Sequence, residues 1–264
     1  MEVAITVLTM YYYIFMPPED RKTKRLYEKI KLKIGLLGIS GEMVQSTPLR
    51  TVEELTELGL TKGYNTIIAI GKDSFINKVA HFLINISLAQ GKENITFGAI
   101  PIEYNESKIS QMIKIKNLDE AIENLRNRHL EKFDVALIEP NKFFILPIEV
   151  YKNKPFYCNL STKTYFIKTL AEKIKITPSL RCKIMDVRSI PNLFQKATKF
   201  LLSTPQGDKY TSSFRAKSFS IESNELIPIQ IDNEILAKTP IKLHTIPKLL
   251  QLIVPRDKIS VINN

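Results

Sequence analysis

The chain has 264 residues, of which 44% are hydrophobic and 25% charged, and its formal net charge is +11. These totals are ordinary for a soluble globular protein of one large or two modest domains, and the two cysteines exclude a disulfide framework and a zinc pattern. The basic excess favours a partner with negative charge, such as an anionic lipid surface, nucleic acid or nucleotide phosphates, but lysines dispersed over a solvated surface explain it equally well. Only nine residues are glycine, about half the usual share, which leaves few places for a phosphate-wrapping loop.

The apolar opening at residues 3–16 predicts a first buried strand around Tyr11–Met16. It is shorter than the roughly 18 apolar residues of a membrane span, and it lacks the basic start and cleavage site of a signal peptide. The two cysteines, Cys158 and Cys182, are expected to be buried or half-buried thiols in a reducing cytoplasm. We therefore expect a cytoplasmic protein.

Two helices are expected before the central strand. The segment Arg21–Lys33 is basic, with apolar residues spaced along one helix face. Its basic side is either a membrane-surface or phosphate-facing surface or the solvated face of a domain helix. Thr51 and Glu54 form a capping box that opens a second helix, which ends near Lys62 with Gly63 as its stop signal.

A strand, a tight turn and a third helix follow. The β-branched run Thr66–Ile70 suits a buried parallel strand, and Gly71 ends it. The apolar spacing from Phe75 onward is helical, with Ser74 as the expected N-cap. The turn lies where a helix N-terminus can face an anion. The order strand–helix–strand–helix indicates an α/β unit with right-handed crossovers.

The pattern continues with a strand at Ile95–Ile100 and a helix at Leu118–Leu125, whose N-cap is Asn117. From about residue 128 onward, short alternating and β-branched runs are separated by Pro, Asn and Ser turns. Such runs are typical of an antiparallel sheet or sandwich, and Glu139–Lys142 is predicted to be a hairpin turn.

These patterns divide the chain into two domains. We expect an α/β N-terminal domain, with a parallel sheet and flanking helices, at 1–127, completed by residues 241–264. A mainly antiparallel β-sandwich domain is expected at 128–240. Within it, residues 190–202 are predicted to form a helix or an irregular crossing.

The central turn reads Gly71-Lys72-Asp73-Ser74-Phe75, and the helix after it opens with Ile76-Asn77-Lys78. In order and spacing this resembles the core motif of the diacylglycerol kinase catalytic-domain family, bacterial ATP-dependent lipid kinases related to NAD kinases. That family has a Gly-Gly-Asp-Gly-Thr turn followed by Ile-Asn-Glu. Gly71, Asp73 and Asn77 match this motif, whereas two glycines, the threonine and the glutamate are replaced.

A second stretch near the C-terminus resembles the same family. It carries Asp232-Asn233-Glu234, then Thr239-Pro240 and Val254-Pro255, at matching spacing. Carboxylates two residues apart on one strand point to the same face, and asparagine at the place of the family's glycine tolerates positive φ. The resemblance spans roughly residues 11–255, but the family's other glycine loops are replaced here at Met16–Asp20 and after Pro101.

The resemblance implies a lipid kinase that binds ATP and magnesium and transfers phosphate to a lipid hydroxyl. In the family the matching aspartate acts as general base and the glutamate helps to order magnesium. The implied catalytic residues are Asp73, Asp232 and Glu234. The implied nucleotide-binding residues are Gly71, Lys72, Ser74 and Asn77. No set of metal ligands is assigned.

Each implied residue also has a structural interpretation. Asp73 is most simply interpreted as an acid that stabilises the start of a helix. Asp232 and Glu234 fit solvated positions on an edge strand. Asn77 and Lys78 fit the exposed side of a helix.

Three functions are therefore compared. The first is an active lipid kinase with ATP and magnesium, in which Lys72 places a charge at the phosphates and the basic surface contacts anionic membrane. The second is a catalytically inactive pseudokinase, without cofactor, that acts as a binding or scaffold protein; Phe75 and the acids Glu103 and Glu106 favour it because they replace small residues of the phosphate loops. A nucleic-acid-binding module is disfavoured, since no aromatic RNP pattern is present.

Overall fold

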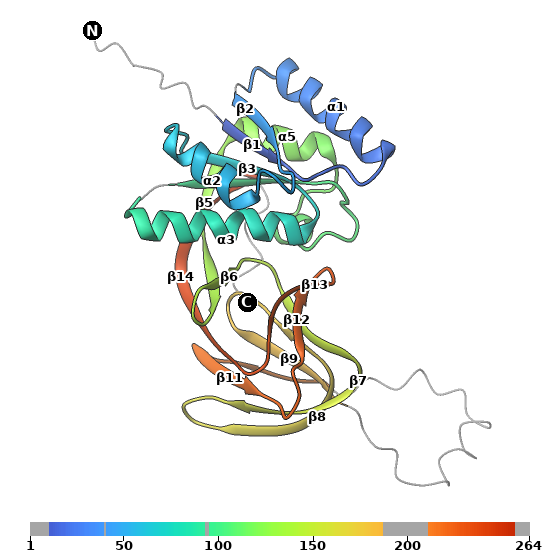
Figure 1. Cartoon of the computed structure of the whole chain (residues 1–264), viewed down its shortest axis with the longest axis vertical. Coiled ribbons are helices and arrows are strands. Elements are labelled where there is room, and N and C mark those ends of the chain that lie inside the picture. Colours follow the sequence, from blue (N-terminus) through green and yellow to red (C-terminus); the bar gives the residue numbers. More distant parts are fainter. Residues whose placement is uncertain (1–10, 40, 93–94, 187–210, 257–264) are drawn as a thin grey trace, which may run out of the picture. The chain divides into compact units, whose positions relative to one another are not determined.

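The computed structural model describes residues 11–39, 41–92, 95–186 and 211–256 (Figure 1). The chain divides into two compact units. The first comprises residues 1–135, 143–146 and 246–264, and the second comprises residues 136–142 and 147–245. Three strands run from one unit into the other, namely β5 (His129–Ile138), β6 (Lys142–Phe144) and β14 (Ile241–Val254).

Parallel strands in the order β2-β1-β3-β4 form the sheet of the first unit, and the end of β14 pairs with β4 in the same direction. The predicted apolar runs are confirmed, since every residue of β1, β3 and β4 is buried. β2 is not anticipated from sequence, because it is a polar, half-exposed strand at the sheet edge. The bounds are β1 (Tyr11–Phe15), β2 (Gly41–Gln45), β3 (Thr66–Gly71) and β4 (Thr96–Pro101).

Helices cover both faces of this sheet (Figure 1). The strand order reverses between β1 and β3, so right-handed crossovers place α1 on one face and α2 with α3 on the other; accordingly α1 packs beside α5, and α2 packs beside α3. The helices are α1 (Arg21–Leu36), α2 (Val52–Thr61), α3 (Asp73–Gln90), α4 (Lys108–Ile113) and α5 (Leu118–Asn127).

The caps show how local sequence sets the helix starts. The predicted capping box of α2 is complete, with Thr51 and Glu54 bonded in both directions, and the Asn117 side chain caps α5. The prediction for α3 is wrong: the helix begins at Asp73, its N-cap is Lys72 rather than Ser74, and no side chain caps it. No helix among the described residues combines the length and apolar character needed to cross a bilayer.

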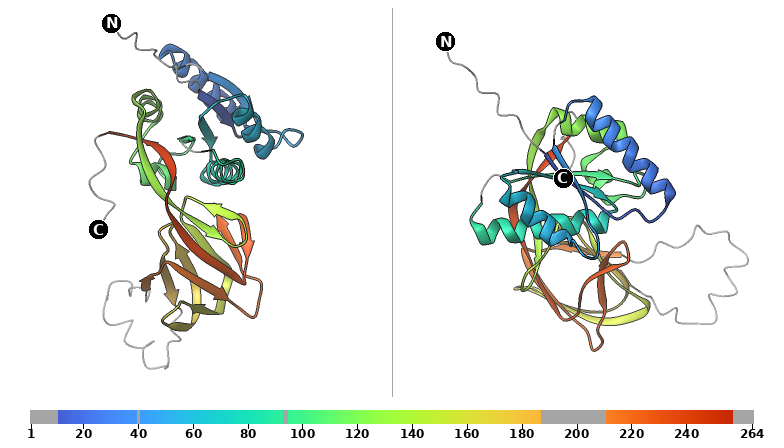
Figure 2. Two further views of the ribbon diagram at one scale, coloured as in Figure 1. Left: turned by 90° about the vertical axis from the view of Figure 1, so that its left-hand side faces the viewer. Right: turned by 45° about the horizontal axis from the view of Figure 1, so that its top comes forward.

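The second unit is built from antiparallel strands, which confirms the predicted strand-rich C-terminal part (Figure 2). Its main sheet has the order β10-β9-β8-β7-β11-β14, and the hairpin β12–β13 also pairs with β7. The expected hairpin turn joins β5 to β6. The strands are β7 (Ile148–Ser161), β8 (Phe166–Ile176), β9 (Arg181–Asp186), β10 (Thr211–Arg215), β11 (Ser218–Glu222), β12 (Pro228–Ile231) and β13 (Glu234–Lys238).

β7 is much longer than its sequence indicates. The polar stretch 152–155 interrupts the alternation, and the pairing with β8 is irregular between Tyr151 and Phe156. On either side of this stretch, alternate residues of β7 point into the core. Cys158 of β7 is one of them, and Cys182 of β9 also points inward; both cysteines are buried and free, as expected. The helix or crossing predicted at 190–202 lies outside the described residues.

Candidate functional site

The carboxyl ends of β1, β3 and β4 lie at one edge of the first unit's sheet, where the strand order reverses between β1 and β3. Open α/β sheets usually bind ligands at such a switch point. Three connections start there: residues 16–20 after β1, the β3–α3 turn at 71–73, and residues 102–107 after β4. The predicted nucleotide-binding residues all lie in the β3–α3 turn or the first turns of α3, so this edge is the candidate site.

Gly71, the last residue of β3, is buried and makes a close approach that only glycine permits. A Cβ atom at this position would lie 2.9 Å from Cβ of Met16 and 2.9 Å from Cδ1 of Phe75. Phe75 itself is 6% exposed. The space on the Cβ side of Gly71 is therefore filled by the chain's own side chains.

Lys72 forms an ion pair across the switch point. Its Nζ lies 2.6 Å from Oε2 of Glu19, a residue of the connection after β1. The hydrogen bond to Glu19 raises the pKa of Lys72, and the nearby carboxylates of Glu103 and Asp20 act in the same direction. The lysine expected to meet phosphates is thus surrounded by acids. Asp20 also stabilises α1, because its side chain caps that helix by accepting from the Thr23 amide at 2.7 Å.

Asp73 is 4% exposed, and its carboxylate is bound by the start of α4 rather than capping its own helix. It accepts from the Ser107 hydroxyl at 2.6 Å, from the Lys108 amide and from the Ile109 amide at 3.4 Å. A carboxylate at a helix N-terminus is stabilised by the amide groups and the helix dipole. Asp73 therefore joins the β3–α3 turn to α4, and local sequence patterns do not reveal this partner because it lies 34 residues away.

Asn77 holds α3 to the segment after β6. Its Oδ1 accepts from the Ile145 amide at 2.9 Å, and one turn later His81 Nδ1 accepts from the Phe143 amide at 3.1 Å. The structural interpretation of Asn77 as an exposed residue is wrong, since the side chain is 1% exposed; Lys78 is exposed as expected. Ser74 is half-buried in the first turn of α3.

Asp232 and Glu234 belong to the second unit and lie at the tip of the β12–β13 hairpin. Asp232 and Asn233 form the two-residue turn, with φ of 48° and 67°, and Glu234 opens β13 opposite Ile231. The expectation that both acids share one strand is wrong, because the turn begins at Asp232. Asparagine does supply the positive φ expected of it. Both carboxylates are exposed.

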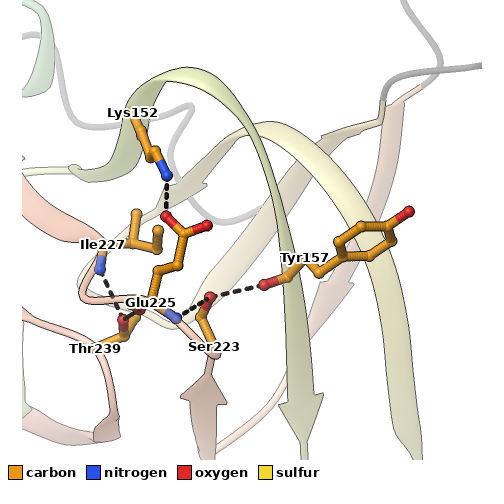
Figure 3. A network of polar contacts seen from close by, with 6 residues as sticks. All are labelled: Lys152, Tyr157, Ser223, Glu225, Ile227 and Thr239. Atoms are coloured by element: carbon orange, nitrogen blue, oxygen red, sulfur yellow. Dashed lines mark hydrogen bonds and ion pairs between the residues drawn. The ribbon is translucent and has the colours of Figure 1, made fainter.

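A polar network holds the base of this hairpin (Figure 3). The buried Thr239 hydroxyl donates to the Glu225 carbonyl at 2.9 Å and accepts from the Ile227 amide at 2.9 Å. Ser223 donates to the carbonyl of Tyr157, whose ring points away from the network, and Lys152 pairs with the Glu225 carboxylate. The threonine of the Thr-Pro pair in the resemblance thus has a structural role, since it closes the loop from which the hairpin starts.

Among the described residues, no cluster of three or more His, Cys, Asp or Glu side chains is placed to hold a metal ion. The structure brings Gly71, Lys72, Asp73, Ser74 and Asn77 together in the first unit, where they are neighbours along the chain. The residues that the sequence did not reveal are their partners, namely Glu19, Ser107 and the segment after β6.

Comparisons with known proteins find no matching family model and no curated protein that matches in sequence. Three solved structures from Bacillus anthracis str. Sterne, each bearing the name diacylglycerol kinase, are similar in fold. The first has a TM-score of 0.72 and 14% sequence identity, and the match covers 94% of this chain and 98% of that structure's chain. The second has a TM-score of 0.71 and 14% identity, with 93% of this chain and 97% of that one covered. The third has a TM-score of 0.69 at 13% identity over 93% and 97%. Along nearly its whole length, this chain therefore has the fold of the diacylglycerol kinases.

Proposed function

We propose that this protein is a diacylglycerol-kinase-like pseudokinase, which acts by binding a partner rather than by transferring phosphate from ATP. One observation carries the proposal: Phe75 and Met16 fill the space beside Gly71, and Phe75 stands where the family's motif has the smaller threonine. A fold alone does not define an activity, so the proposal rests on the residues at the carboxyl ends of the strands rather than on the similarity of fold.

The charges at the same edge support this proposal. Lys72 is paired with Glu19 and has two further acids nearby, so it offers little attraction to a triphosphate. The Asp73 carboxylate already accepts from three donors at the start of α4. Binding a metal ion through Asp73 would compete with these bonds, which stabilise the fold.

An active lipid kinase is the second candidate, favoured by the similarity of fold over more than nine-tenths of the chain and by the exposed acids of the β12–β13 turn. In this alternative, ATP and magnesium are the cofactors, Asp232 accepts the proton of a lipid hydroxyl, and Glu234 helps to order the metal. In both, the protein works in the cytoplasm, with peripheral contact to anionic membrane.

The thermal midpoint with and without millimolar magnesium-ATP, GTP or NAD separates the two candidates. A ligand at 100 times its dissociation constant stabilises the native state by about 2.7 kcal/mol. We expect no shift for the wild-type chain. If the ring of Phe75 is the obstacle, Phe75→Thr gains a shift with ATP and the control Phe75→Leu does not.

A direct assay complements the binding test. The chain is incubated with labelled ATP, magnesium and mixed lipids, and label in the organic phase is counted. Transfer that disappears in Asp232→Asn establishes the kinase and refutes the pseudokinase. This variant is clean because Asp232 is exposed and asparagine keeps the positive φ of the turn.

A further inference from the structure

The outer face of β8, β9 and β10 carries five basic side chains in adjacent positions. The pairing of the strands places Lys175 opposite Lys183 and Arg181 opposite Arg215, and Lys173 lies two residues from Lys175 on the same face. The alternate residues, such as Ile174 and Ile184, point inward and are buried. We call the five residues the basic face: Lys173, Lys175, Arg181, Lys183 and Arg215.

This arrangement is unfavourable for the isolated protein. Like charges directly opposite each other on neighbouring strands destabilise a sheet. One acid, Glu149 of β7, pairs with Lys173 and Lys175. Within the part of the chain that the structure describes, Arg181, Lys183 and Arg215 have no ion pair, and all three are exposed. A partner that supplies several negative charges at once would remove the repulsion.

We propose that the basic face is a docking surface for an anionic lipid bilayer. A sheet face presents its charges side by side, and neighbouring strands lie about 4.8 Å apart, so all five can meet one layer of headgroups together. One large aromatic side chain, Tyr151 of β7, is exposed beside the basic face, where it lies opposite Lys173; Tyr157 and Phe166 are exposed farther along β7 and β8. Aromatic side chains of this kind settle at the interface between headgroups and acyl chains.

The rings of Tyr151 and Phe166 argue against a single-stranded nucleic acid as the partner. Nucleic-acid platforms need free ring faces on which bases stack. Here the Lys173 Nζ lies 5.5 Å from the centre of the Tyr151 ring, and the Lys168 Nζ lies 5.6 Å from that of Phe166. A cation over the ring occupies the face that a base would use. Docking through the basic face requires no nucleotide, so it is independent of the proposed loss of ATP chemistry.

Sedimentation with lipid vesicles tests the proposal on the full chain. One set of vesicles is pure phosphatidylcholine, and the other contains equal parts of phosphatidylcholine and anionic phosphatidylglycerol. We expect binding to the anionic vesicles alone, weakening as salt is raised. Arg181→Gln/Lys183→Gln should lower the partition coefficient about 25-fold, because each basic residue near an anionic surface contributes about a factor of five.

The matched control is Lys22→Gln/Arg25→Gln on α1, a separate basic helix of the first unit. It also removes one lysine and one arginine, both exposed, and it should leave binding unchanged. Weaker vesicle binding by the Arg181→Gln/Lys183→Gln variant cannot be attributed to unfolding, because neither side chain has a partner within the described structure. The substitutions should therefore keep or raise the thermal midpoint, which is measured alongside. Equal binding by the β9 variant, loss in the α1 variant, or preferential binding of a labelled single-stranded RNA would each overturn the proposal.

Discussion

The edge of the first unit's sheet and the outer face of the second unit differ in how their charged side chains are paired. At the edge, Lys72 is paired with Glu19, and Asp73 is bound by the start of α4. On the outer face, Lys175 lies opposite Lys183 and Arg181 opposite Arg215. Buried or paired charges contribute to the fold, whereas unpaired like charges cost stability and are kept where a partner compensates them. The contrast is consistent with both proposals: the charges at the sheet edge stabilise the fold, and those of the basic face remain available to a partner.

The largest change in stability is expected for Asp73→Ala. Removing the carboxylate leaves the Ser107 hydroxyl and two amides of α4 without their acceptor, so we expect the free energy of unfolding in urea to fall by about 3 kcal/mol. Asp73→Asn keeps one acceptor oxygen and should lose clearly less. A loss below about 0.5 kcal/mol, the range of ordinary surface changes, would show that Asp73 does not stabilise the fold.

The second test concerns the space beside Gly71. In Gly71→Ala the new methyl group overlaps Met16 and Phe75, and such overpacking should cost about 2 kcal/mol. The same change made in a Phe75→Ala background should cost less, because the ring is no longer in the way. Urea denaturation of the four proteins gives the coupling energy, expected at about 1 kcal/mol. Strict additivity would mean that the ring does not fill the space beside the glycine.

Two lysine-to-glutamine changes give the sharpest comparison of the two regions. Lys72→Gln breaks the pair with Glu19 and should lower stability by up to about 1 kcal/mol. Lys183→Gln relieves the repulsion from Lys175 and should raise stability by about 0.2–1 kcal/mol. Both effects should shrink in high salt. Changes of the same sign in both variants would contradict the contrast.

The smallest effect is expected from the thiols behind the basic face. Cys182 lies between Arg181 and Lys183 but points inward, and burial raises its pKa, like that of Cys158, from 9.0 to about 12. Because the folded state favours the protonated thiols, they contribute fully to the stability of the fold below their unfolded pKa near 9. This contribution is lost as the pH rises towards 12. Iodoacetamide at pH 8 should therefore label the native chain far more slowly than the chain in urea. Rapid native labelling would show that the sheet opens.

Local sequence patterns were sufficient to predict several elements of the fold. The apolar runs of β1, β3 and β4, the capping residues Thr51 and Asn117 and the hairpin turn after β5 all follow from periodicity and from bonds within a few residues. β2 and most of β7 escaped prediction, because a polar edge strand and an interrupted strand lack alternation. The motif order and spacing also predicted the fold shared with the diacylglycerol kinases.

The contacts of the motif residues, in contrast, could not be predicted without the folded structure. Asp73 meets the start of α4 and Asn77 meets the segment after β6, contacts that join residues 34 and 68 positions apart. The register of β8, β9 and β10, which places like charges opposite one another, depends equally on pairing between strands. The physical reason is common to both. The partner of such a side chain depends on how distant segments pack together, and local sequence patterns do not predict that packing.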